Sequence, residues 1–221
     1  MATIRKFPLV KDEIYHIYNR SIARYQIFNI TVEFSRMREL FSYYQRGEKK
    51  QRFSEWKKRK NVIPEKKDLE IKKANKLVSI IAYCIMPTHF HLILKQLKDK
   101  GISVFMSQIS NSYTRYFNLK HKRKGPLWER EFQNVLVSTD EQLLHLTRYI
   151  HLNPVTAFLA DKPEDWLFSS YKEFLGEVEE GGKICSFENI LDIAPKQYKT
   201  FVDDRISYQR DLDKIKHLTL E

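Results

Sequence analysis

The stretch Met86-Pro87-Thr88-His89-Phe90-His91-Leu92-Ile93-Leu94 decides the fold, because it ends one β-rich run and begins the next. The two runs are separated only by Pro87 and Thr88, which predicts adjacent antiparallel strands or a hairpin. In the second strand, which we expect to be half-buried, side chains two residues apart share a face. His89 and His91 therefore project together, while the residues between and after them turn toward the core.

Two interpretations of His89 and His91 stay open at this point. Two imidazoles on one face can hold one metal ion. They can equally be surface or half-buried side chains of an ordinary strand. Residues elsewhere in the chain have to decide between the two.

Around this hairpin the pattern predicts alternating strands and helices. β-branched and aromatic runs predict strands at 13–20, 77–86, 89–96 and 132–137. Helical spacing predicts helices at 31–47 with Thr31 as N-cap, from 101 to about 120, and from 138 to Asn153-Pro154. Hairpins rather than long crossovers suit an antiparallel sheet covered on one face by helices, so the predicted fold class is α+β, of the ferredoxin-like kind.

Positive charge is unevenly distributed along the 221 residues. The formal net charge is +11, yet residues 160–221 hold 9 Lys and Arg against 14 Asp and Glu. A surplus of this size points to a polyanionic partner, with nucleic acid ahead of a membrane surface. We expect one main domain at 1–160 with a basic insertion near 46–75, followed by an acidic, mostly helical segment at 161–221.

Composition excludes several classes of protein. With 42% hydrophobic residues, the chain is not of the disordered type. Cys84 and Cys185 stand far apart, so neither a disulfide framework nor a thiolate zinc site is expected. The longest apolar run is too short to span a bilayer, and charged residues near the N-terminus replace the core of a signal peptide. We expect a cytoplasmic protein without a membrane partner.

The last predicted helix of the main domain carries the second group of candidates. Spacing of four places His145, Tyr149 and Asn153 on one stripe of this helix. A phenol becomes a useful nucleophile only when its proton is removed or balanced by a base or cation. Two imidazoles and one amide oxygen leave open positions on Mg²⁺ or Mn²⁺ for water and phosphate. Asn153 could therefore complete a site begun by the histidine pair.

Five separated blocks carry a family resemblance over residues 12 to 175. They are Tyr15-His16-Ile17-Tyr18-Asn19-Arg20; Met86-Pro87-Thr88-His89-Phe90-His91; Leu127-Trp128-Glu129-Arg130 with Phe132; Tyr149-Ile150-His151-Leu152-Asn153-Pro154-Val155; and Trp166 with Ser169-Ser170-Tyr171. Together they resemble the single-tyrosine, insertion-sequence-type transposases of the HUH endonuclease superfamily, most of all the REP-associated tyrosine transposase branch.

The resemblance implies an enzyme that binds single-stranded or hairpin DNA and cuts it through a covalent 5′-phosphotyrosine. Matched position by position, Tyr149 is the nucleophile, His89 and His91 are metal ligands, and Asn153 is the third ligand. One departure concerns Glu131, where relatives often carry a small or basic residue. This departure leaves the DNA sequence preference open.

The basic runs 46–60 and 115–124 supply candidates for contact with DNA. They are interleaved with Phe53, Trp56, Tyr113 and Tyr116, which favours phosphate contact combined with stacking on unpaired bases. The candidate DNA-binding residues, including two from the first block, are Asn19, Arg20, Lys49, Lys50, Arg52, Lys57, Lys58, Arg59, Arg115, Lys120, Lys122, Arg123, Lys124 and Arg130.

Several alternatives remain open from the sequence. His145 is either a proton-transfer group or an exposed helix residue, and His151 has the same ambiguity. His16 lies in a strand that could neighbour the histidine pair. The whole chain could be a non-catalytic hairpin-DNA or RNA binding protein, or its metal could be structural. The sequence is compatible with a monomer and with a homodimer, and nucleoid association is expected.

Overall fold

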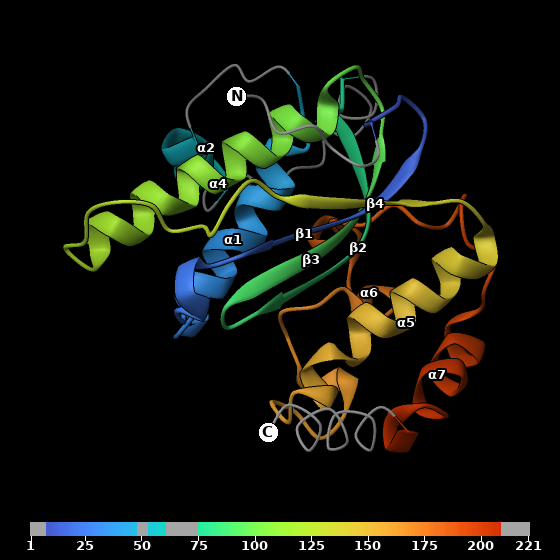
Figure 1. The fold of residues 1–221 in the computed structure, drawn as a ribbon. Coiled ribbons are helices and arrows are strands. Elements are labelled where there is room, and N and C mark those ends of the chain that lie inside the picture. The colour runs from blue at the N-terminus through green and yellow to red at the C-terminus, as the bar shows by residue number, and fades with distance from the viewer. Residues whose placement is uncertain (1–7, 48–52, 61–74, 209–221) are drawn as a thin grey trace.

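The computed structural model describes residues 8–47, 53–60 and 75–208 (Figure 1). Within these ranges no helix is long and apolar enough to cross a membrane. The elements in chain order are β1 (Ile14–Arg20), α1 (Thr31–Tyr44), α2 (Phe53–Lys60), β2 (Val78–Met86), β3 (His89–Gln96), α4 (Gly101–Lys120), β4 (Gln133–Val137), α5 (Asp140–Thr156), α6 (Tyr171–Phe174) and α7 (Pro195–Asp203), with 3₁₀ turns at Ile22–Arg24, Pro163–Asp165 and Glu180–Gly182.

The four strands form one antiparallel sheet in the order β2-β3-β1-β4. Helix α1 connects β1 to β2, and helix α4 connects β3 to β4, which is the split βαβ arrangement of ferredoxin-like folds. The predicted α+β fold is therefore confirmed. The hairpin predicted at Pro87 and Thr88 is also present, since β2 pairs with β3 directly across that turn.

Helices cover both faces of the sheet, whereas the sequence pattern predicted cover on one face. On one face Phe90 of β3 meets Phe41 of α1 at 5.6 Å between ring centroids, and Phe41 also contacts Phe105 of α4. Helix α5 lies across the opposite face, where Tyr149 meets His91 (Figure 1). Because of this second cover, β3 is buried on both sides, and the expectation of a half-buried strand is wrong.

Two helix boundaries differ from the pattern. Ile30, not Thr31, is the N-cap of α1, and Thr31 is its first helical residue. Helix α5 does not end before Pro154 but continues to Thr156. A proline near the end of a helix removes only one backbone hydrogen bond, so the last turn tolerates it. Thr139 is the N-cap of α5, because its side chain accepts a hydrogen bond from the backbone N–H of Gln142.

The acidic C-terminal segment packs against the edge of β2. Backbone hydrogen bonds join Ser170 to Tyr83 and Ser186 to Ile80, at 2.9 Å each, and an isolated bridge pairs Cys84 with Ser169. The segment thus covers an edge strand that would otherwise expose its unpaired backbone groups. The helices described in this segment are short. Its assignment as a separate unit stays a prediction.

Candidate active site

His89 and His91 lie on the face of β3 that α5 covers. Their ring centroids are 5.0 Å apart, and the planes are nearly perpendicular. Burial lowers the pKa of His89 to about 4, helped by the charges of Arg20 and Arg24. Burial also lowers the pKa of His91 well below its usual value. Both imidazoles are therefore neutral at physiological pH, which is the form that binds metal ions.

Both imidazoles have one ring nitrogen already engaged. Nδ1 of His91 lies 2.9 Å from Nε2 of His16, and Nδ1 of His89 lies 2.9 Å from the hydroxyl of Thr88. Such contacts fix ring orientation and tautomer in metal sites. Within the described part of the chain, Nε2 of each ring has no hydrogen-bond partner. His16 of β1 is therefore a neighbour of the histidine pair, as its position in the sequence allowed. Burial lowers the pKa of His16 to about 4.

Tyr149 of α5 lies beside this cluster. Its ring centroid is 6.1 Å from that of His91, with the rings edge to face. The side chain remains 44% exposed, so solvent or a substrate can reach it. Burial raises the pKa of its phenol, the nearby Tyr18 adds to the rise, and Arg20 opposes it. The hydroxyl is therefore protonated at neutral pH and needs an external charge or base to act as a nucleophile.

Asn153 follows one turn after Tyr149 on α5. Its side-chain nitrogen Nδ2 is buried and has no hydrogen-bond partner in the described structure. The two ends of an amide can be exchanged by a rotation, so this group is able to offer oxygen to a cation. Among the described residues, no three His, Cys, Asp or Glu side chains form a group that could hold a metal. The role of Asn153 as the third ligand stays a prediction.

His151, between these two residues on α5, is fully buried and fixes the helix. Its Nδ1 lies 2.6 Å from the hydroxyl of Tyr198, and its Nε2 lies 2.7 Å from Oγ of Ser170. Ser170 Oγ in turn accepts a hydrogen bond from the backbone N–H of Tyr83 on β2. From the sequence alone, His151 could be either a proton-transfer group or a structural residue. His151 and Ser170 belong to two of the five sequence blocks. Their membership in these blocks was the sequence feature that could have indicated their contact.

His145, near the start of α5, contacts Arg148 and helix α7. Its Nδ1 is 2.7 Å from the guanidinium of Arg148, and its ring meets Phe201 of α7 at 5.5 Å. These contacts direct His145 toward α7. Its proton-transfer role stays a prediction.

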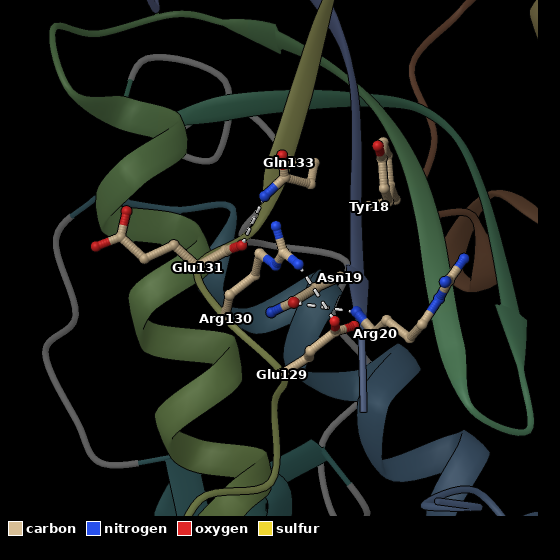
Figure 2. Close-up of a pocket in the computed structure, with 7 residues that line it drawn as sticks. All are labelled: Tyr18, Asn19, Arg20, Glu129, Arg130, Glu131 and Gln133. Carbon is tan, nitrogen blue, oxygen red and sulfur yellow. Dashed lines mark hydrogen bonds and ion pairs between the residues drawn. The ribbon is translucent and has the colours of Figure 1, made fainter. Parts of the chain in front are cut away.

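The candidate DNA-binding residues fall into three groups. Asn19, Arg20 and Arg130 line a pocket of about 250 Å³ between the end of β1 and the start of β4 (Figure 2). Lys49, Lys50 and Arg52 lie outside the described residues, as does the side chain of Arg59. The remaining members lie on α2 and α4 or in the turn that follows α4.

Among these remaining members, some are tied to neighbours and others are exposed. Lys120 pairs with the buried carboxylate of Glu33 at 2.8 Å, and Lys57 pairs with Glu39 at 2.7 Å. Arg123 donates hydrogen bonds to Asn118 and to the carbonyl of Pro126. The exposed members are Lys58, Arg115, Lys122 and Lys124.

Three of the four aromatic residues of the basic runs are buried, so the expectation of base stacking is wrong for them, while Tyr116 of α4 is half-buried. Phe53 and Trp56 are each only 7% exposed and pack on Tyr43 of α1. Tyr113 is fully buried and donates its hydroxyl to the carbonyl of Ile27. Residues three apart on α2 share one face, and that face is turned into the core.

Comparisons with known proteins point in one direction. Residues 54–153 match the family model described as "Transposase IS200 like". A Haemophilus influenzae protein named as a REP-associated tyrosine transposase is 27% identical over 101 residues, which cover 41% of this chain and 57% of that protein. The match therefore spans little more than half of that relative.

A solved structure has the same fold. It is described as a REP-associated tyrosine transposase bound to a REP hairpin, and it superposes with a TM-score of 0.52 at 16% identity. The similarity covers 84% of this chain and 93% of the other. The resemblance recognised from the five sequence blocks is thus confirmed: in sequence and in fold, this chain is similar to the IS200-like, REP-associated tyrosine transposases.

Proposed function

We propose that this chain is a single-stranded DNA endonuclease and strand transferase whose nucleophile is Tyr149. The observation that carries the proposal is the contact of the Tyr149 ring with His91, a buried, neutral imidazole beside the partly buried His16 and His89. A phenol beside such a cluster, reachable from solvent, fits attack on an external phosphodiester better than a purely structural role.

The reaction proposed is a transesterification. The Tyr149 oxygen forms a bond to phosphorus while the bond from phosphorus to the 3′ oxygen breaks. The phenol proton passes to solvent at the exposed side of the ring, and the leaving 3′ oxygen takes up a proton. The 5′ phosphate stays bonded to tyrosine, so the released 3′-OH can later attack that bond and reseal DNA without ATP.

A divalent metal, Mg²⁺ or Mn²⁺, belongs to the same proposal. The free Nε2 atoms of His89 and His91 and the unpartnered amide of Asn153 are a donor set that fits it. When bound, the ion would supply positive charge to phosphate oxygens. His16 and Thr88 would hold the two imidazoles in the ligating tautomer.

The substrate we propose is hairpin or repeat DNA with unpaired flanks. The support is the likeness to a transposase solved with a REP hairpin and the net charge of +11. A cytoplasmic, nucleoid-associated location follows from such a substrate. Whether one chain or a homodimer acts remains a prediction from sequence.

The covalent intermediate provides the test. Hairpin DNA with single-stranded flanks, labelled at its 3′ end, is incubated with protein and Mn²⁺ or Mg²⁺ and resolved on a denaturing gel. Wild-type protein is expected to retain the label as a protein adduct, which Tyr149→Phe and EDTA abolish. Tyr208→Phe is the matched control, because Tyr208 is exposed to a similar degree, 51%, and lies outside the site.

An adduct that persists in Tyr149→Phe would contradict the proposed nucleophile. Salt-sensitive hairpin binding without any adduct, unaffected by EDTA, would favour the alternative of a non-catalytic hairpin-DNA or RNA binding protein. Thermal destabilisation of His89→Ala without loss of cleavage would indicate a structural metal.

A further inference from the structure

The ladder between β1 and the chain that enters β4 contains a gap. Tyr18 pairs with Gln133, and the carbonyl of Arg20 accepts a hydrogen bond from the N–H of Glu129 at 3.0 Å. Between these two points β1 advances by two residues, while the opposite chain advances by four. The additional residues must leave the ladder, and the space beside Asn19 is the pocket of about 250 Å³ (Figure 2).

Asn19 compensates for the missing partner strand. Its Oδ1 accepts the hydrogen bond of the Arg20 backbone N–H at 3.0 Å, and the side chain is only 5% exposed. Its Nδ2 has no hydrogen bond among the described residues. The floor of the pocket therefore carries a fixed amide with unused donors.

The walls combine an aromatic ring with groups of both hydrogen-bonding kinds. Tyr18 presents a ring, Gln133 an amide, Arg130 a guanidinium and Glu129 a carboxylate, whereas the carboxylate of Glu131 points away from the other labelled side chains (Figure 2). The guanidinium of Arg130 is already paired with the Glu129 carboxylate at 3.3 Å, which weakens its hold on a phosphate, whereas the edge of an unpaired base offers both donors and acceptors. Proteins that bind single strands commonly stack such bases on aromatic rings. A nucleobase therefore fits this pocket better than a phosphate does.

The pocket adjoins the proposed active site. Its Tyr18 ring lies 5.9 Å from the ring of His91, and its Arg20 stands directly opposite His89 in the register of β1 and β3. A nucleotide whose phosphate lies at Tyr149 would thus have its neighbouring base within reach of the pocket.

We propose that this pocket binds one unpaired base next to the cleaved phosphate, and that Glu129 and Gln133 read its edge. The proposal rests on the proposed function, since it takes single-stranded DNA as the ligand. It assigns a role to Glu129, whose carboxylate lies beside the guanidinium of Arg130 in this pocket. The amide of Asn19 serves the same base from the floor.

The test is a binding selection that does not depend on cleavage. A pool of DNA hairpins with randomised unpaired flanks is bound to Tyr149→Phe protein in EDTA, and the retained strands are sequenced. One flank position is expected to show a base preference. Adding Glu129→Gln or Gln133→Ala should reduce that preference about tenfold, in line with the value of one good base contact. Glu177→Gln, an exposed carboxylate elsewhere, should leave it unchanged.

Two outcomes would overturn the base pocket: no preference at any flank position, or a preference that survives both substitutions. Neither depends on the chemistry of Tyr149. Conversely, if wild-type protein forms no covalent adduct while the preference depends on Glu129 and Gln133, the proposed cleavage is wrong and the base pocket stands. The test of the base pocket uses only the Glu129 and Gln133 variants. It does not need Asn19→Ala, a change that could disturb the fold.

Discussion

The two faces of the central strands β1 and β3 carry different side chains, although one backbone supports both. On the face toward α1 and α4, Ile17 and Phe90 are fully buried in an apolar core. On the face toward α5, the alternate positions Tyr18 and His91 meet in a cluster of polar rings. The two-residue period of a strand separates stability from chemistry within one sheet.

This difference shows how a candidate site can be both buried and rigid. The α1 and α4 face supplies apolar packing, which holds β1 and β3 in register. The α5 face can then hold neutral imidazoles, since one ring nitrogen of each finds a partner, His91 in His16 and His89 in Thr88. The comparison predicts that acid and mutation affect the two faces in different ways.

Acid should act on the α5 face and have the largest effect on stability. The folded pKa is about 4 for His89 and about 3 for His151, against 6.5 for an ordinary histidine. Between these values only the unfolded chain takes up the proton, so stability is complete above about pH 6.5 and falls as the pH approaches the folded pKa values. By pH 4.5 the loss should be on the order of 5 kcal/mol for the two residues together.

Urea unfolding at pH 7, 5.5 and 4.5 measures this loss. His151→Gln should be less stable at pH 7 but show a shallower dependence on pH, because one of the titrating groups is gone. An unfolding free energy that stays level from pH 7 to 4.5 would mean that the imidazoles are not held neutral by burial.

Phe90→Ala should damage the apolar face and leave the polar one intact. Removing a fully buried phenylalanine costs about 3–5 kcal/mol of unfolding free energy. The cost should be the same at pH 7 and pH 6, since no titrating group is involved. Chemical denaturation measures it, and His91→Ala is the matched neighbour on the other face. If both variants stay folded and lose cleavage equally, the proposed chemistry would not be specific to the α5 face.

Ser170→Ala should loosen the helix that carries Tyr149. The substitution leaves Nε2 of His151 and the N–H of Tyr83 without their partner, at a cost of about 1–3 kcal/mol. Amide hydrogen exchange should therefore increase in α5 and in β2 near Tyr83. Ser186→Ala is a suitable control, because Ser186 joins β2 through its backbone rather than its side chain. Unchanged exchange in α5 would mean that the network does not fix the helix.

The sequence allowed the order of strands and helices along the chain and much of the candidate site to be anticipated, for local reasons. The alternation in β3 and the four-residue spacing in α5 predicted which face carries His91 and which stripe carries Tyr149. Their proximity in the structure agrees with the pattern. The ligand role of Asn153 stays a prediction, since no bound ion tests it.

Features that depend on distant parts of the chain could not be predicted in the same way. The network of His151 requires Ser170 and Tyr198, which pack together only after the acidic segment has reached β2. The core position of Phe53 and Trp56 had a local signal, their three-residue spacing, but the surrounding lysines favoured an exposed interpretation. Tertiary packing decided against that interpretation.

The smallest effect is expected outside both faces, in the turn after α4. Lys124 is exposed and has no ion pair in the described structure, so Lys124→Gln should change the unfolding free energy by no more than about 0.5 kcal/mol. If Lys124 contacts a DNA phosphate, the slope of log binding constant against log salt concentration should fall by about 1. Titrations of hairpin DNA at four salt concentrations measure the slope. Lys120 is paired with Glu33, so it should contribute less to this slope. If Lys120→Gln lowers the slope more than Lys124→Gln does, the pair of Lys120 and Glu33 opens to bind DNA.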